Sequence, residues 1–245
     1  MEIVEFHKQS LLSFGSWLFR QTLLCYCKPK NVSYFNRIGG NPFLLPLPLL
    51  PPKRNVFISS FHNDRAEVDA FIYKWATVEK VFTPKALATF DNDELIKSNN
   101  PEYVMGVIRR DYIGDASVTI VLIGRCTHSR RYVDWEIKAS LRRGESSPNG
   151  LLAYVLQSAT PQITPFVDWD KLPWPSLPER LAANWNYYQQ PSCYACYYTL
   201  PDSAATLRQN IENAFSDRTK RAELIKNDSV MMGYDGKCKV CGVTH

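Results

Sequence analysis

Polar and aromatic side chains that could carry chemistry gather in two loops of the sequence. The first loop follows a short apolar run and contains Ser60, Phe61 and His62. The second follows the apolar run at residues 117–123 and contains Thr127. Hydroxyl and imidazole groups can bind a ribose or a phosphate, and an aromatic ring can stack on a flat ligand. The loops therefore predict a site for a small polar molecule. The alternatives are that Phe61 packs in the core and that His62 has a structural role.

A carboxylate on the helix after the second loop is the main candidate for catalysis. Val133, Ile137 and Leu141 recur at helical spacing and predict the buried stripe of this helix. Successive helix residues are about 100° apart, so Glu136 falls at the edge of the stripe, where it can face a water-filled crevice. Trp135 beside it could stack on a ligand ring or pack in the core. On spacing alone, a solvated helix acid is the simpler interpretation of Glu136.

The elements that must position these side chains alternate between strands and helices. Buried strands are predicted from apolar runs at residues 56–58, 117–123 and 151–156, with a weaker strand between residues 81 and 90. Asp64 and Glu67 are spaced as an acidic capping box at the start of the first helix. The pattern predicts an α/β fold with a central, mainly parallel sheet and helices on both faces. In such a sheet, ligands bind beyond the carboxyl ends of the strands, where both loops lie.

The chain divides into three parts by composition. Residues 1–52 end in a run of prolines, which excludes a helix or a central strand there. We therefore expect an N-terminal extension or linker at residues 1–52, a folded domain at 53–226 and a C-terminal tail with helical and cysteine-containing segments at 227–245. The extension has three open interpretations: a disordered arm, an upstream start codon that lengthens the frame, or an arm that contacts a partner or a membrane.

The overall composition is ordinary for a globular protein. Hydrophobic residues make up 45% of the chain and charged residues 22%, with a net charge of +5, which excludes wholesale disorder. No basic stripe interleaved with aromatic residues occurs, so nucleic-acid binding is not expected. Residues 11–27 are apolar but interrupted by Arg20 and Gln21, short of the roughly 20 residues that span a bilayer. An odd number of cysteines, seven, favours the reducing cytoplasm over an exported protein.

Four of the cysteines form two C-x-x-C pairs. One pair is Cys193 with Cys196, and the other is Cys238 with Cys241. Four thiolates can hold a zinc ion in a closed, structural site. Two pairs of unligated thiols are the alternative, because a long helix is predicted between the pairs.

Three blocks of sequence occur in order along the chain: VFISSFH at residues 56–62, SVTIVLIG at 117–124 and RYVDWEI at 131–137. Together they resemble the signature blocks of the TIR-like family, specifically the TIR-like subunit of Thoeris anti-phage systems. The resemblance implies a flavodoxin-like TIR fold and cleavage of NAD at its nicotinamide–ribose bond. It implies that Glu136 is catalytic, because Glu136 occupies the place of the family's glutamate. Asp91 matches an acidic position after the family's second strand.

Cleavage of NAD is chemistry that a lone carboxylate can support. Breaking a glycosidic bond passes through an oxocarbenium-like transition state and normally needs an acid to protonate the leaving group. Nicotinamide leaves NAD as a neutral molecule, so one ionised glutamate that stabilises the developing charge is sufficient. The resemblance further implies a signal derived from ADP-ribose, a cyclic form included, a product-sensing effector protein and a phage-derived trigger. A noncatalytic TIR interaction module is the alternative.

Overall fold

The computed structural model describes five segments of the chain, residues 52–86, 100–142, 147–161, 175–185 and 193–244. Strands and helices alternate along them. The elements are β1 (Asn55–Ser60), α2 (Arg65–Ile72), β2 (Thr83–Ala86), α4 (Pro101–Val107), β3 (Val118–Ile123), α5 (Arg131–Ser140), β4 (Gly150–Val155), α6 (Glu179–Asn184), β5 (Cys196–Thr199) and α7 (Ala204–Lys220). The predictions for the N-terminal extension and for Asp91 concern residues outside the described segments.

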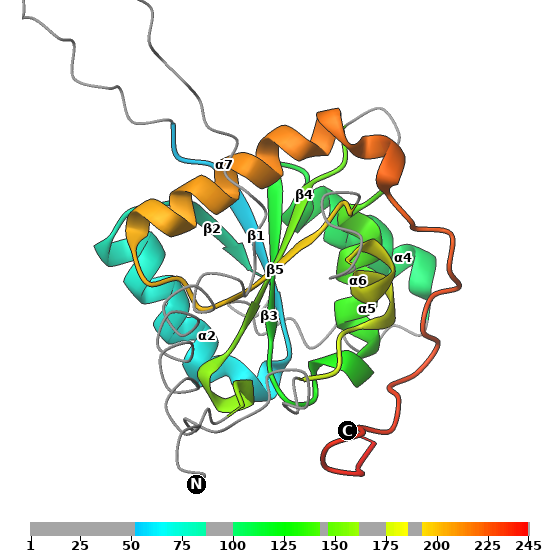
Figure 1. The fold of residues 1–245 in the computed structure, drawn as a ribbon. Coiled ribbons are helices and arrows are strands. Elements are labelled where there is room, and N and C mark those ends of the chain that lie inside the picture. The colour runs from blue at the N-terminus through cyan, green and yellow to red at the C-terminus, as the bar shows by residue number, and fades with distance from the viewer. Residues whose placement is uncertain (1–51, 87–99, 143–146, 162–174, 186–192, 245) are drawn as a thin grey trace, which may run out of the picture. The chain divides into compact units, whose positions relative to one another are not determined.

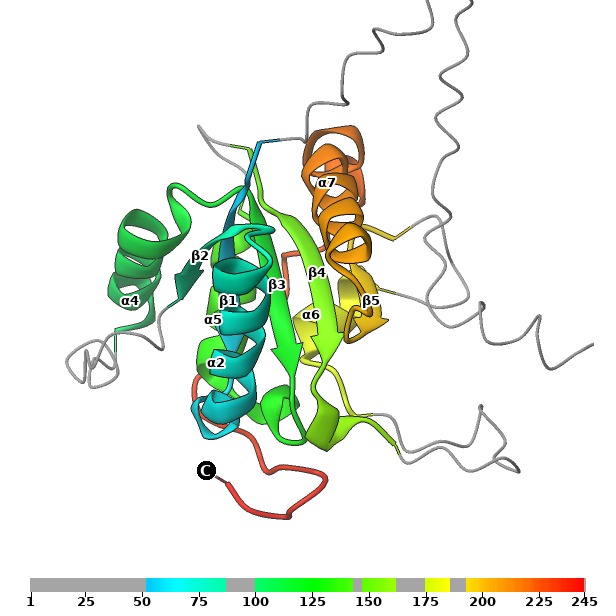
Figure 2. The same ribbon diagram turned by 90° about the vertical axis from the view of Figure 1, so that its left-hand side faces the viewer.

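Five parallel strands form the central sheet, in the order β2-β1-β3-β4-β5. Every residue of β3 and β4 is buried. Figures 1 and 2 show the reason, because α2 and α7 cover one face of the sheet and α4, α5 and α6 cover the other. This is the strand order of flavodoxin-like folds. The predicted α/β architecture, with a parallel sheet and helices on both faces, is therefore confirmed.

Side-chain caps form at the starts of α4 and α7. Asn100 Oδ1 accepts a hydrogen bond of 3.2 Å from the backbone N–H of Tyr103, which caps α4 as its Asn-Pro start predicts. The hydroxyl of Ser203 accepts a bond of 3.1 Å from Thr206 N at the start of α7. The capping box expected at Asp64 is not formed, because the Asp64 side chain makes no bond to its own helix. That side chain instead enters the functional site described below.

Two elements, α6 and β5, lack a clear signal in the sequence. β5 has only four residues and lies at the edge of the sheet, so its side chains alternate between buried and more exposed positions. Tyr198 on β5 stacks on Tyr154 of β4 with 5.6 Å between ring centroids. Such a short edge strand lacks the continuous apolar run that marks the central strands.

The C-terminal segment, defined here as residues 226–244, packs against the domain. Asn184 at the end of α6 exchanges two hydrogen bonds with the backbone of Lys226. Farther along, the indole N–H of Trp135 donates a bond of 2.8 Å to the carbonyl of Met232. Figure 1 shows the segment, in orange and red, descending beside α5 and α6. The predicted tail thus covers one flank of the helix that carries Glu136.

Candidate functional site

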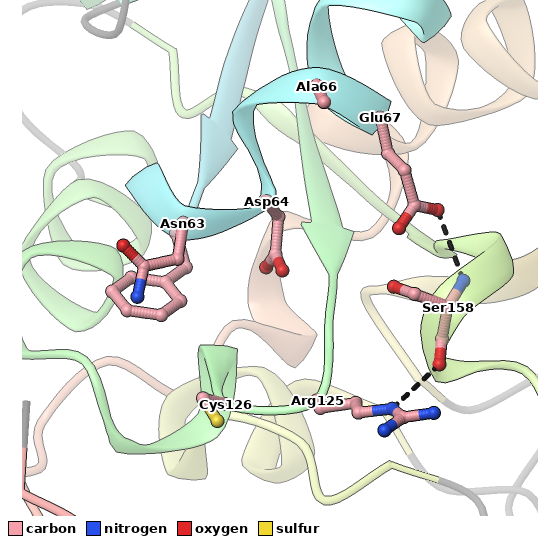
Figure 3. A pocket seen from close by; sticks show the side chains of 8 residues that line it. Asn63, Asp64, Ala66, Glu67, Arg125, Cys126 and Ser158 are labelled. Atoms are coloured by element: carbon pink, nitrogen blue, oxygen red, sulfur yellow. Dashed lines mark hydrogen bonds between the residues drawn. The ribbon is translucent and has the colours of Figure 1, made fainter.

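A pocket of about 470 Å³ lies beyond the carboxyl ends of the strands (Figure 3). It sits where β1 and β3 are neighbours although β2 comes between them in sequence, which is the position where open α/β sheets bind ligands. Its walls come from the segment after β1, the loop after β3 and the turn after β4. The lining residues are Phe61, Asn63, Asp64, Ala66, Glu67, Arg125, Cys126 and Ser158. Both loops selected from the sequence therefore contribute to one pocket.

Two hydrogen bonds join opposite walls of the pocket (Figure 3). Ser158, after β4, donates its backbone N–H to Glu67 at 3.1 Å and accepts a bond of 2.8 Å from Arg125 Nε through its carbonyl. Asp64 points between these walls, with its carboxylate against Gly124 at the end of β3. A Cβ at Gly124 would collide with that carboxylate, so a larger residue there would displace the Asp64 side chain. Burial, and next the charge of Glu67, raise the pKa of Asp64.

Glu136 is buried beside the end of β1. Its carboxyl oxygen Oε2 accepts a hydrogen bond of 2.5 Å from Ser59 Oγ, and the residue is only 6% exposed. Burial raises the pKa of Glu136 to about 8, against a smaller lowering by the Ser59 hydroxyl. The expectation that Glu136 faces a water-filled crevice is therefore wrong. The helix is enclosed on both flanks of its apolar stripe, because Asp134 on the other flank is buried against Arg180.

The carboxyl of Glu136 and the pocket both lie at the carboxyl end of β1. Ser59 contacts Glu136, and Phe61, two residues later, lines the pocket. Glu136 itself does not belong to the pocket lining.

Arg130 is a functional candidate that sequence reasoning missed. It is 4% exposed, and its guanidinium lies 4.2 Å from the centre of the Phe61 ring. Its Nε donates to the carbonyl of Cys126 at 3.3 Å, whereas Nη1 and Nη2 have no hydrogen-bond partner among the described residues. Two unsatisfied donors on a buried cation suit an anionic ligand such as a phosphate. The sequence signal was an arginine directly before the N-terminus of α5, where the helix dipole also favours anions.

The remaining predicted site residues have different surroundings. Phe61 is 4% exposed and lines the pocket, with the exposed ring of His62 at 4.5 Å, edge to face. Ser60 is partly exposed at the end of β1. Thr127 is fully buried, and its hydroxyl accepts a bond of 2.8 Å from the backbone N–H of Gly124, which is a structural role.

Trp135 packs in the core rather than in the pocket. The residue is 1% exposed and lies in a cluster with Phe57 and Ile108, and its indole N–H is bonded to Met232. These contacts leave no ring face for a ligand. Of the two proposed roles for this side chain, core packing agrees with the structure.

The predicted four-cysteine cluster is not formed. Cys238 and Cys241 gather with Cys126, from the loop after β3, while Cys193 and Cys196 are buried at the start of β5. The path of the chain explains the difference. The C-terminal segment follows α5 to the carboxyl ends of the strands, whereas β5 lies at the edge of the sheet.

The buried carboxyl of Glu136 should make stability depend on pH. Its pKa of about 8 in the folded protein lies above the ordinary 4.5, so the folded state holds the proton more tightly than the unfolded state. The contribution to stability is then fully present below about pH 4.5 and is lost as pH rises through about 8. We expect Glu136→Gln, which cannot ionise, to exceed the wild type in unfolding free energy by a few kcal/mol near pH 8.5 and by little near pH 5. Urea unfolding at both pH values measures this, and a difference that does not change with pH would contradict it.

Comparison with known proteins agrees with this architecture. A family model described as Thoeris protein ThsB, TIR-like domain, matches residues 57–160. The match extends from β1 to the turn after β4 and includes Glu136 and the whole pocket lining. No curated protein matches the sequence. Among the described residues, none of the helices has the length and apolar character needed to span a bilayer. Residues 57–160 therefore form a TIR-like domain of the Thoeris ThsB type.

Proposed function

We propose that this protein cleaves NAD between nicotinamide and ribose, with Glu136 as the carboxylate that stabilises the positive charge of the transition state. The match of residues 57–160 to the Thoeris TIR-like domain indicates a role in anti-phage defence. The observation that carries the proposal is the buried carboxyl of Glu136 beside the end of β1, next to the pocket beyond the ends of the paired strands β1 and β3. A carboxylate in such a water-poor position acts far more strongly on a developing charge than it would in water.

The pocket has features that suit a dinucleotide. Its volume of about 470 Å³ is within the usual range for small-molecule sites. The two unsatisfied donors of Arg130 are suited to a diphosphate, and this guanidinium lies over the ring of Phe61, which lines the pocket. Arginine prefers phosphate because its planar group can donate two parallel hydrogen bonds.

The proposed reaction requires the ionised form of Glu136. With a pKa of about 8, most of the ligand-free protein carries a protonated carboxyl at neutral pH. The nicotinamide ring of NAD is a cation, and an opposite charge within about 4–6 Å favours the ionised carboxylate. Substrate binding then favours the active charge state, and kcat/KM should rise with pH until about pH 8.

One observation favours the alternative of a noncatalytic interaction module. Glu136 does not line the pocket, and a protonated, buried glutamate bonded to Ser59 could serve packing alone. The two functions differ in what happens to NAD. In the catalytic case, the bond between nicotinamide nitrogen and ribose C1′ breaks, nicotinamide leaves with the bonding electron pair, and water or an internal hydroxyl of ADP-ribose takes its place.

Chromatography of NAD incubated with the purified protein tests the proposal. The incubation is carried out with and without extract from phage-infected cells, because the family context implies a phage-derived trigger. We expect nicotinamide and an ADP-ribose derivative, linear or cyclic, to appear in equal amounts. Intact NAD in both incubations would favour the interaction module. Within the proposal, the protein acts in the cytoplasm, where the product reaches an effector protein that senses it.

A further inference from the structure

Three thiols from distant parts of the sequence meet beside the pocket. Cys126 follows β3, and Cys238 and Cys241 belong to the C-terminal segment. The sulfur of Cys126 lies 3.1 Å from that of Cys238 and 3.6 Å from that of Cys241, and all three sulfurs are within 4.8 Å of one another. None of the three is in a disulfide. Figure 2 shows the segment, in red, at the arrowhead end of β1 and β3.

The backbone between Cys238 and Cys241 forms a tight turn that directs both sulfurs toward Cys126. The carbonyl of Cys238 accepts a hydrogen bond of 2.9 Å from Gly242 N, and the N–H of Val240 points at the Cys238 sulfur at 3.4 Å. Gly242 has a φ of +73°, a conformation that favours glycine. A bridge between Lys237 and Thr244 closes the base of the turn. N–H groups aimed at sulfur stabilise the thiolate form that a metal requires.

We propose that Cys126, Cys238 and Cys241 bind one zinc ion. Three thiolates are a common part of tetrahedral zinc sites, and a Zn–S length of about 2.3 Å places sulfur atoms about 3.8 Å apart. The separations of 3.1 and 3.6 Å are close to this value, so small rotations of the side chains suffice. Binding involves no oxidation or reduction, because three thiols release three protons and a water molecule takes the fourth position on the metal.

The metal would fasten the C-terminal segment to the wall of the pocket, because Cys126 is one of the lining residues. Two further bonds already join these parts, one from Gly236 N to the carbonyl of Ser129 and one from Lys239 N to His128 Nε2. Two of the three ligands come from the C-terminal segment, so the segment cannot separate from Cys126 without loss of the metal. The proposed role of the metal is to hold this segment in place, and it does not depend on whether the protein cleaves NAD.

Metal analysis of the full-length protein tests the site. The protein is purified without chelator, kept reduced with a phosphine and exchanged into metal-free buffer. We expect about one zinc per chain in the wild type and less than about 0.2 in each of Cys126→Ser, Cys238→Ser and Cys241→Ser. Cys241 is exposed, so its replacement leaves the core intact and its result does not depend on folding. The double variant with Cys193→Ala and Cys196→Ala is the matched control and should keep its zinc.

Cobalt provides a second measurement on the same variants. Bound metal is first removed by chelator, and Co²⁺ is then added. The wild type should give an intense thiolate-to-cobalt absorption. The double variant with Cys193→Ala and Cys196→Ala should retain this absorption, and Cys241→Ser should lack it. Absence of zinc together with absence of this absorption in the wild type would overturn the proposal. Loss of metal in the Cys193, Cys196 control with retention in Cys126→Ser would also overturn it, in favour of four cysteines in two pairs.

Discussion

Replacing Glu136 with glutamine should lower the rate of nicotinamide release by about a hundredfold or more, which is the usual effect of removing one preorganised electrostatic group. Glutamine has nearly the same shape, and its carbonyl oxygen can still accept the hydrogen bond that Ser59 Oγ makes at 2.5 Å. What is lost is the ability to carry a negative charge next to the forming oxocarbenium ion. Binding of NAD should largely survive, because the proposed diphosphate and ring contacts involve other residues, Arg130 and Phe61 among them.

The measurement compares nicotinamide release by the wild type and Glu136→Gln at equal folded concentration, with the trigger present. Glu79→Gln is the control, because it makes the same substitution at an exposed position outside the pocket lining. Thermal unfolding of each protein accompanies the assay. Since Glu136→Gln is expected to gain stability above neutral pH, its loss of activity cannot be attributed to unfolding. Equal rates in two folded proteins would refute the catalytic role and support the interaction module.

The strands and the ligand-binding edge of the fold were predictable because their signals are local. The uninterrupted apolar run of β3 requires cover on both faces, and this alone indicates the centre of a parallel sheet. Once the strands are known, their carboxyl ends place the loops that carry Phe61 and Thr127 at the same edge. Helical spacing likewise placed Val133, Ile137 and Leu141 in the core, where all three are buried.

The surroundings of α5 were not predictable, because they depend on contacts between distant parts of the chain. Spacing within the helix put Glu136 at the edge of the apolar stripe, facing water, but both Glu136 and Asp134 on the other flank are buried. Asp134 is enclosed by Arg180 from α6 and by the backbone of Met232, 98 residues away. The same limit applies to the cysteines. The C-x-x-C spacing identifies Cys238 and Cys241 as a pair, yet nothing local reveals that their neighbour is Cys126.

Arg180 connects the elements that enclose α5. Its side chain is 1% exposed and forms a 2.9 Å ion pair with Asp134, which is 5% exposed. The other guanidinium nitrogens donate to the backbone carbonyls of three residues in the C-terminal segment: Asn227, Ser229 and Val230. One cation thus satisfies a buried carboxylate and three carbonyls at once. A side chain with so many partners has a large effect when it is removed, whatever the net contribution of the ion pair.

Arg180→Ala should therefore lower the unfolding free energy by about 3–5 kcal/mol, because it leaves the charge of Asp134 buried without its partner. Urea unfolding measures the loss, with Arg110→Ala as the control. Arg110 pairs with Asp111 at the surface, where water screens both charges, so this replacement should change stability far less than Arg180→Ala. In the double variant Arg180→Met with Asp134→Leu, no charge remains buried, so part of the loss should be recovered. If Arg180→Ala is as stable as the Arg110→Ala control, water reaches Asp134 and the C-terminal segment does not seal this flank of α5.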